Sequence, residues 1–287
     1  MVLESEDCKR RIPAPVRVGL ILSLLLTAAA ACAEEPSLQE TPKTAYIAII
    51  IDDLGNSLRE GRRAIRLPGP VAGAILPHTA HSRHLAQEAY ARNKEVLLHL
   101  PMESLDQVEP GPGVLDSTMP KRELEMTLDY DLETVPHAVG VNNHMGSLLT
   151  QQPRAMRFLM QAISRRGNLF FIDSLTSPDS QAARTASEYG VPALARNVFL
   201  DNERTPDAIE QRLEELVSIA RRKGSALAIG HPYAETLEVL ERWLPTLPDK
   251  NIQLVPLSVM LAKISLPKKT QTSRRPGNAT WQPYSFR

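Results

Sequence analysis

Residues 48–55 read AIIIDDLG, an apolar run followed by two adjacent carboxylates, a leucine and a glycine. An apolar run without alternation is typical of a strand buried on both faces, as in a parallel sheet covered by helices. Further apolar runs end in a similar way at His99, His144 and His231. Side chains at the carboxyl ends of parallel strands share one mouth of the fold, where α/β active sites lie. These strand ends predict a hydrolytic metal site.

Strand-like and helix-like segments alternate along the chain from this first strand onward. The expected strands are 46–51, 71–76, 95–99, 138–142, 168–172, 193–200, 225–230 and 252–255. The expected helices are 56–66, 80–93, 120–134, 153–166, 178–189, 205–223 and 234–244. Gly167, Gly190 and Gly224 each follow a helical segment, where a left-handed residue commonly ends a helix. The count predicts one α/β barrel, complete or distorted, of seven or eight βα units.

One stretch of the chain departs from this alternation. Between His99 and Pro120 the sequence contains Pro101 and the run Pro110-Gly111-Pro112-Gly113. Prolines and glycines at this density oppose regular structure, so we expect a long loop over the site.

The two ends of the chain differ in composition from the barrel domain, which we place at 45–264. Residues 1–33 have the order of a secretory signal peptide, with basic residues, an uncharged run and a small-x-small cleavage site. Residues 34–44 are rich in Pro, Glu, Thr and Ser and predict a linker. Residues 265–287 carry basic residues and no acid, which predicts a disordered tail in weak contact with anionic envelope polymers.

We therefore expect an exported protein that is periplasmic or secreted after cleavage at Ala33. The alternative is a membrane-anchored protein, held through an uncleaved leader or a lipid-modified Cys32. Cys8 and Cys32 are the only cysteines, so a metal in the folded domain must be held by His, Asp or Glu. The formal net charge is zero and no basic stripe crosses the domain, which argues against nucleic acid as a partner.

The carboxylate pair Asp52-Asp53 is the strongest candidate for chemistry. Adjacent residues at a strand end point to different sides, so one can bind a metal while the other faces the attacking water. The alternative is a helix cap with Asn56 or Ser57. His144 lies in a polar cluster in which Asn142 and Asn143 can orient a histidine or bind a substrate carbonyl.

His99 and His231 each end an apolar strand, and the alternative for either one alone is a core histidine with satisfied hydrogen bonds. Asp173, Ser174 and Asp201 occupy the same strand-end position. Either aspartate can orient a histidine or cap the next helix, and of the two we expect Asp173 rather than Asp201 to act at the site.

The motifs AIIIDDLG, LLHLPME, GVNNHMGS, FFIDS and AIGHP, in this order, resemble the divergent polysaccharide deacetylase family of exported bacterial proteins. The resemblance covers about residues 45–262, and the segment 142–147 is its most specific part. It implies the distorted (β/α)7-8 barrel of polysaccharide deacetylases, which use a divalent metal to remove N-acetyl groups from sugars.

The resemblance also implies roles for individual residues. Asp52 matches the base, Asp53 matches the metal-binding aspartate, and His231 matches the late-strand acid. His99 stands at the place of the first metal histidine, but Glu103 occupies the place of the second. We expect His144 to supply the missing imidazole, and Asn142, Asn143, Glu103, Asp173 and Ser174 to bind substrate or orient the ligands.

The resulting expectation is a carbohydrate deacetylase, a hydrolase of linear amide C–N bonds that removes N-acetyl groups, or in a variant of this reading O-acetyl groups, from an envelope carbohydrate such as peptidoglycan. Zn²⁺ is the expected cofactor, although manganese, nickel and cobalt also suit a His/carboxylate set. Aromatic residues are only 5% of the chain, so stacking platforms for sugars look scarce. Two alternatives stay open: an inactive envelope scaffold that retains the barrel, and a hydrolase of another bond such as an ester.

Overall fold

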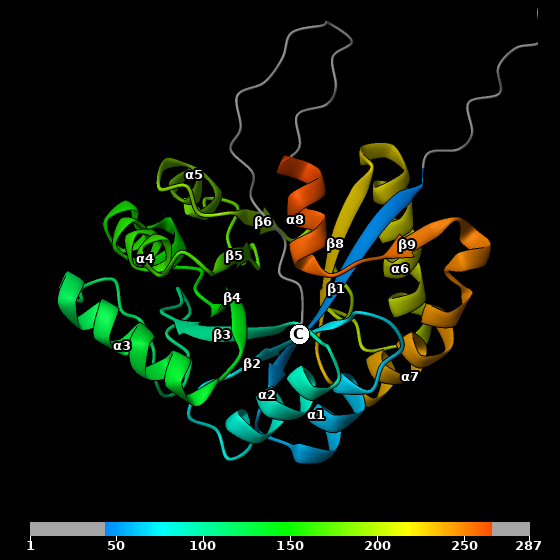
Figure 1. Ribbon diagram of the computed structural model, residues 1–287, viewed down its shortest axis with the longest axis horizontal. Coiled ribbons are helices and arrows are strands. Elements are labelled where there is room, and N and C mark those ends of the chain that lie inside the picture. The colour runs from blue at the N-terminus through cyan, green and yellow to red at the C-terminus, as the bar shows by residue number, and fades with distance from the viewer. Residues whose placement is uncertain (1–43, 266–287) are drawn as a thin grey trace, which may run out of the picture. The chain divides into compact units, whose positions relative to one another are not determined.

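The computed structural model describes residues 44–265, which alternate between strands and helices in nearly the expected order (Figure 1). The strands are β1 (Ala45–Leu54), β2 (Ala72–Ile75), β3 (Val96–Met102), β4 (Ala138–Met145), β5 (Phe170–Asp173), β6 (Ala193–Ala195), β7 (Val198–Phe199), β8 (Ser225–Gly230) and β9 (Ile252–Leu254). The helices are α1 (Leu58–Ile65), α2 (Ser82–Ala91), α3 (Lys121–Thr134), α4 (Pro153–Arg166), α5 (Ala182–Glu188), α6 (Pro206–Lys223), α7 (Ala234–Trp243) and α8 (Leu257–Ser265). Short 3-10 helices are η1 (Leu149–Gln151), η2 (Leu244–Thr246) and η3 (Pro248–Lys250).

The predicted leader at 1–33 lies outside the described residues, as do the linker up to residue 43 and the tail from residue 266. Within the part that is described, no helix is long and apolar enough to cross a bilayer.

All strands join one parallel sheet in the order β6-β5-β4-β3-β2-β1-β8-β7, with β9 beside the start of β1. Ile50 of β1 is in register with Ala72 of β2 on one side and with Ile229 of β8 on the other. From β1 to β6, each strand lies beside the one before it. This succession of βα units confirms the predicted barrel class, and Figure 1 shows the sheet curling between its two ends.

The two edge strands of the sheet are consecutive in the chain. The strand β6 ends at Ala195 and β7 begins at Val198, so Arg196 and Asn197 alone connect the two edges. A connection this short spans at most about 11 Å, which forces the sheet to curl into an almost closed barrel. The single strand predicted at 193–200 is therefore wrong. The chain crosses the seam of the barrel there, so β6 pairs with β5 and β7 pairs with β8.

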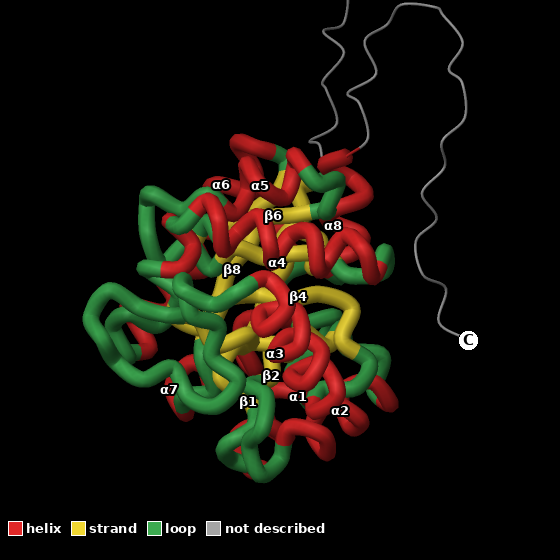
Figure 2. Tube along the Cα trace, turned by 90° about the vertical axis from the view of Figure 1, so that its left-hand side faces the viewer, coloured by secondary structure: helices red, strands yellow, loops and turns green. Residues whose placement is uncertain are grey.

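The sheet carries a hydrophobic core on each face, because successive strand residues point to opposite sides. Ile49 belongs to the larger cluster, which the outer helices α1, α2, α3, α4, α5, α6 and α7 cover. Ile50 belongs to the smaller cluster, together with Met260 and Leu261 of α8. In Figure 2, α3 and α4 lie in front of the strands that they cover.

Helix α8 was not predicted from the sequence. Its residues are mostly apolar with no polar face of helical period, because the helix packs inside the curve of the sheet. The carboxylate of Glu95 accepts hydrogen bonds from the backbone N–H groups of Leu257 at 2.6 Å and Ser258 at 3.1 Å. These bonds satisfy two donors at the start of α8, so the helix begins against the entry of β3.

Candidate metal centre

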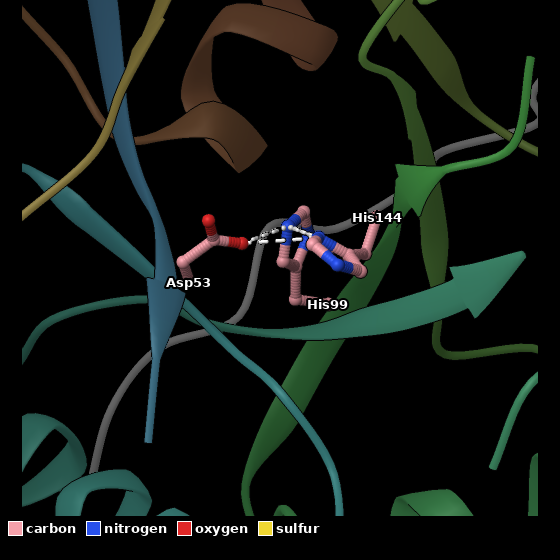
Figure 3. Close-up of side chains that lie close together, drawn as sticks. All are labelled: Asp53, His99 and His144. Atoms are coloured by element: carbon pink, nitrogen blue, oxygen red, sulfur yellow. Dashed lines mark hydrogen bonds and ion pairs between the residues drawn. The ribbon is translucent and has the colours of Figure 1, made fainter. Parts of the chain in front are cut away.

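Three side chains from strands β1, β3 and β4 converge at the mouth of the barrel (Figure 3). Oδ1 of Asp53 lies 3.0 Å from Nε2 of His99 and 3.0 Å from Nδ1 of His144. The two ring nitrogens are 3.1 Å apart. Among residues 44–265, no other group of three or more His, Cys, Asp or Glu residues brings its ligand atoms this close together.

The local backbone explains how adjacent strand residues reach this point. Asp53 has a left-handed φ of 56°, and the register of β1 against β2 shifts between Ile51 and Leu54. Aspartate tolerates this conformation better than most residues. Met145 and Gly146 likewise have positive φ values, of 54° and 86°, directly after His144. The strand ends therefore turn at the residues that carry the candidate ligands.

The proton on His99 is fixed by Asn142. The amide nitrogen of Asn142 donates to Oδ1 of Asp52 at 2.9 Å, so its oxygen faces Nδ1 of His99 at 3.0 Å. An amide oxygen only accepts, which means that His99 carries its proton on Nδ1. In the neutral ring that binds a metal, Nε2 of His99 then presents a lone pair to Asp53 and His144.

The converging atoms fit a cation. Oδ1 of Asp53 is buried, and no donor of residues 44–265 approaches it with hydrogen-bond geometry although two ring nitrogens are 3.0 Å away. Burial would raise the pKa of Asp53, but the His144 and His99 rings outweigh it and hold the pKa far below its usual value. Ligands about 2.1 Å from one ion are about 3.0 to 3.4 Å apart at octahedral and tetrahedral angles. The observed separations match the short end of that range.

Asp52 lies beside this group with its side chain almost completely buried. Its Oδ2 is 3.6 Å from Nε2 of His99. Burial raises the pKa of Asp52, and this effect outweighs the opposing charges of His99 and His231. A carboxylate with a raised pKa accepts a proton more readily than an exposed one, which suits a general base.

His231 approaches the same mouth from the end of β8. Its Nδ1 lies 2.9 Å from Oδ1 of Asp201, and Oδ2 of Asp201 accepts from the backbone N–H of His231 and the hydroxyl of Thr236. Nε2 of His231 lies 3.8 Å from Oδ2 of Asp53. Burial disfavours the charged ring, but the Asp201 carboxylate outweighs it and raises the pKa of His231. This arrangement suits a proton donor.

From the sequence we expect Asp173 rather than Asp201 to orient a histidine, but in the structure Asp201 does so. Asp201 follows β7, which pairs with β8, and so reaches His231. The carboxylate of Asp173 accepts from the backbone N–H of Leu175 and from the hydroxyl of Ser180, and so serves the loop after β5. The contact of Asp201 depends on the pairing of β7 with β8, a pairing that strand patterns along the chain do not reveal.

The remaining predicted site residues hold the strand ends in place. Asn143 accepts from the backbone N–H of Ser174 at 2.8 Å and donates to the carbonyl of Met145 at 2.7 Å. The hydroxyl of Ser174 lies 3.4 Å from the amide nitrogen of Asn142. Glu103 accepts from the backbone N–H of Ser117 and so braces the long loop. Asn142 and Asn143 are both buried; Asn142 contacts the candidate ligand His99, whereas Asn143 links β4 to the segment after β5.

A pocket of about 290 Å³ opens beside Asp53 and His144. Its walls are the loop after β2, with Thr79, and the segment 109–112 of the long loop after β3. Asn56 lines it from the loop after β1. The loop predicted over the site thus forms one wall of the space that a substrate would enter.

Comparison with known proteins gives one family and several relatives. A family model described as divergent polysaccharide deacetylase matches residues 49–261. The uncharacterized protein YibQ of Escherichia coli K12 is 37% identical over 233 residues, covering 81% of this chain and 71% of the relative. An uncharacterized protein of Haemophilus influenzae is 36% identical over 209 residues, covering 73% of this chain and 74% of the relative.

A solved structure supports the fold. The crystal structure of an uncharacterized protein from Agrobacterium tumefaciens C58 matches with a TM-score of 0.73 at 26% identity, covering 76% of this chain and 89% of that chain. All three relatives are described as uncharacterized, so an activity must be argued from the site itself.

Proposed function

The chain belongs to the divergent polysaccharide deacetylase family, and from this premise we propose that it is a metal-dependent hydrolase of acetyl groups on a cell-envelope carbohydrate. The acetyl group is N-linked or O-linked. The observation that carries the proposal is the convergence of Asp53, His99 and His144, at which the buried Oδ1 of Asp53 has no hydrogen-bond partner within residues 44–265. The buried carboxylate of Asp52 lies near His99, and the imidazole of His231 lies near Asp53.

Asp53, His99 and His144 would hold the divalent cation. When bound, the cation would supply Lewis acidity, which polarises the acyl oxygen and lowers the pKa of a bound water. Zinc is the proposed metal, because imidazole and carboxylate ligands with open positions are typical of its catalytic sites. The hydrogen bond from His99 to Asn142 supports a role for His99 as a metal ligand, since it keeps the Nε2 lone pair directed at the site.

Asp52 would act as the general base. Its Oδ1 is held by the amide of Asn142, which leaves Oδ2 on the side of His99 and the candidate ligands. A water placed there would lose its proton to Oδ2 as it attacks the acyl carbon.

His231 would act as the general acid. Asp201 holds Nδ1, so the free position of the ring is Nε2, which faces Asp53. Protonated at Nε2, the ring would give its proton to the departing amine or alcohol as the acyl bond breaks.

The compartment is a separate part of the proposal. The basic and apolar order of residues 1–33 indicates export, which would bring the domain to the envelope carbohydrate. Mass spectrometry of the protein purified from the producing cell would test this. We expect an N-terminus at Glu34, and retention of the complete leader would contradict export by cleavage.

The test of the activity is release of acetate from N-acetylated and O-acetylated glycans by the zinc-loaded protein. Acetate release should be lost in Asp52→Asn, which keeps the acceptor for Asn142 and should therefore keep the fold and the metal. Asp249→Asn is the matched control, since Asp249 is exposed and distant from the mouth. Tight glycan binding without acetate release in the unaltered protein would favour the inactive scaffold instead.

A further inference from the structure

The side of the mouth opposite the pocket carries two guanidiniums. Arg196 lies in the seam between β6 and β7, and Arg204 lies in the segment after β7. Neither forms an ion pair with a carboxylate of residues 44–265. Many other arginines, such as Arg62, Arg63 and Arg165, are paired with a glutamate. The two arginines at the mouth are therefore available to an anion from outside.

Arg196 is held rigidly by backbone carbonyls. Its Nε donates to the carbonyl of Ser174 at 2.7 Å and its Nη2 to that of Leu175 at 3.1 Å. Nη1 makes no hydrogen bond within the described residues. The guanidinium is half-buried and lies 4.3 Å from the centre of the Phe199 ring. A guanidinium fixed in this way offers donors at little further entropic cost.

Arg204 is held by the side chain of Tyr233. It lies 3.5 Å from the centre of the Tyr233 ring, and its Nη2 donates to the Tyr233 hydroxyl at 2.6 Å. Arg204 is exposed, and a guanidinium stacked on a ring keeps its edge donors free for a carboxylate or a phosphate.

Both rings also contact His231. The Phe199 ring stacks on His231 with centres 5.3 Å apart, and the Tyr233 ring lies 5.4 Å from it. Two aromatic rings thus flank the proposed acid. Each guanidinium therefore lies over a ring that contacts His231.

The pocket on the other side has the opposite character. The loops after β2 and β3 build it, and the sheet order places these strands across the barrel from β6 and β7. Glu109 lines it together with Asn56 and Thr79, and no lysine or arginine is among its lining residues. The amide and hydroxyl suit neutral sugar hydroxyls, and the carboxylates of Glu109 and Asp53 repel an anion.

We propose that Arg196 and Arg204 bind an anionic oxyacid group of the substrate, a carboxylate or a phosphate, so that the protein selects acidic glycans over neutral ones. The inference rests on the proposed function for its choice of a glycan. The inference also gives the direction in which the glycan lies across the mouth. The neutral sugar enters the pocket beside Glu109, and the charged substituent extends past His231 toward the seam.

The test is calorimetric binding to zinc-loaded Asp52→Asn, in which turnover is blocked. The ligands are a neutral N-acetylglucosamine oligomer, an oligomer of the same length with a lactyl carboxylate on alternate sugars, and a phosphodiester-linked N-acetylhexosamine oligomer. We expect at least one anionic ligand to bind roughly tenfold more tightly than the neutral one, and which of the two does so identifies the group. Arg196→Gln and Arg204→Gln should each remove most of that preference and leave neutral binding within about twofold.

Two further variants separate recognition from structure. Arg196→Lys should retain part of the preference, because the charge stays while the fork is lost. Arg154→Gln is the matched control, since Arg154 also lies over a phenylalanine ring but at the start of α4. Equal affinity for all three ligands, equal weakening of neutral and anionic binding by the arginine variants, or no binding of any ligand overturns the proposal. A retained preference without acetate release in the active protein would overturn the proposed function alone.

Discussion

Asn142 accepts the Nδ1 proton of His99 at 3.0 Å. This one hydrogen bond determines which nitrogen of His99 faces Asp53 and His144. Because the other end of the same amide donates to Asp52, the orientation of the ring is linked to the proposed base. The metal ligand and the base are therefore held by a single buried side chain.

Replacing Asn142 by leucine should lower metal affinity without unfolding the domain. The apolar side chain has a similar size but cannot fix the His99 tautomer, and loss of such a partner typically costs about 10- to 100-fold in affinity. Competition with a chromogenic chelator would measure it. Asn168→Ala, at an exposed position before β5, should leave the affinity unchanged. An unchanged affinity in Asn142→Leu would show that the tautomer does not depend on this bond.

Asp201→Asn should shift the alkaline limb of the pH–rate profile to lower pH. The carboxylate raises the pKa of His231, so a neutral amide lets that pKa fall. An acid acts only while protonated, and activity is therefore lost at a lower pH in the variant. The measurement is kcat/KM for acetate release against pH with the same metal in both proteins.

Thr236→Val is the control for Asp201. It removes one hydrogen bond to the same carboxylate and leaves the charge in place. Its alkaline limb should stay close to that of the unaltered protein. If both variants shift the limb equally, the effect comes from packing around Asp201 and not from its charge.

Asp131 should make stability depend on pH. It is fully buried on α3 beside His78, and burial raises its pKa to about 8 from an ordinary value of 3.8. The stabilising contribution of a group with a raised pKa is complete below its unfolded-state pKa and is lost as pH rises through about 8. Asp131→Asn removes this titration, so its melting temperature relative to the unaltered protein should rise between about pH 5 and about pH 9.

The comparison for Asp131 is Asp129→Asn on the same helix, where the carboxylate is 62% exposed. Asp129 pairs with Arg166, and that variant should show no comparable rise between about pH 5 and about pH 9. A constant difference for Asp131→Asn as well would mean that Asp131 stays ionised in the folded protein.

Gly113 and Gly111 offer a matched pair in the long loop. Both have positive φ values, 82° and 100°, so alanine is strained at either position. A Cβ at Gly113 would lie 2.2 Å from Oδ1 of Asp131, whereas a Cβ at Gly111 meets nothing within 4 Å. Gly113→Ala should therefore destabilise the protein by about 1–3 kcal/mol more than Gly111→Ala.

Thermal unfolding and limited proteolysis of the loop would measure that difference. Cleavage between residues 103 and 119 should become faster in Gly113→Ala, because the loop no longer packs against Asp131 of α3. Equal stability of the two variants would contradict the contact between this loop and Asp131.

Much of the barrel could be predicted from the sequence because its signals are local. Buried parallel strands are continuous apolar runs, and glycines end the helices before β5 and β8. The clustering of Asp53, His99 and His144 also follows from a local fact, since each follows an apolar run of a strand. Asp53 and His144 lie at the carboxyl ends of β1 and β4, whereas β3 continues past His99 to Met102, beyond the predicted end at residue 99.

The features that escaped prediction depend on which segments become neighbours. The apolar run at 193–200 looks like one strand, but the curl of the sheet divides it at Arg196. The role of Asp201 depends on the pairing of β7 with β8, and α8 depends on the space inside the curve. The left-handed conformation of Asp53 could not be predicted, because the residue is not a glycine.

The central claim is that Asp53, His99 and His144 hold one divalent cation. Anomalous diffraction from crystals of the zinc-loaded protein tests it most directly. The account predicts one ion within about 2.0–2.2 Å of Oδ1 of Asp53, Nε2 of His99 and Nδ1 of His144. An ion bound elsewhere, or no ion at saturating zinc, would contradict it.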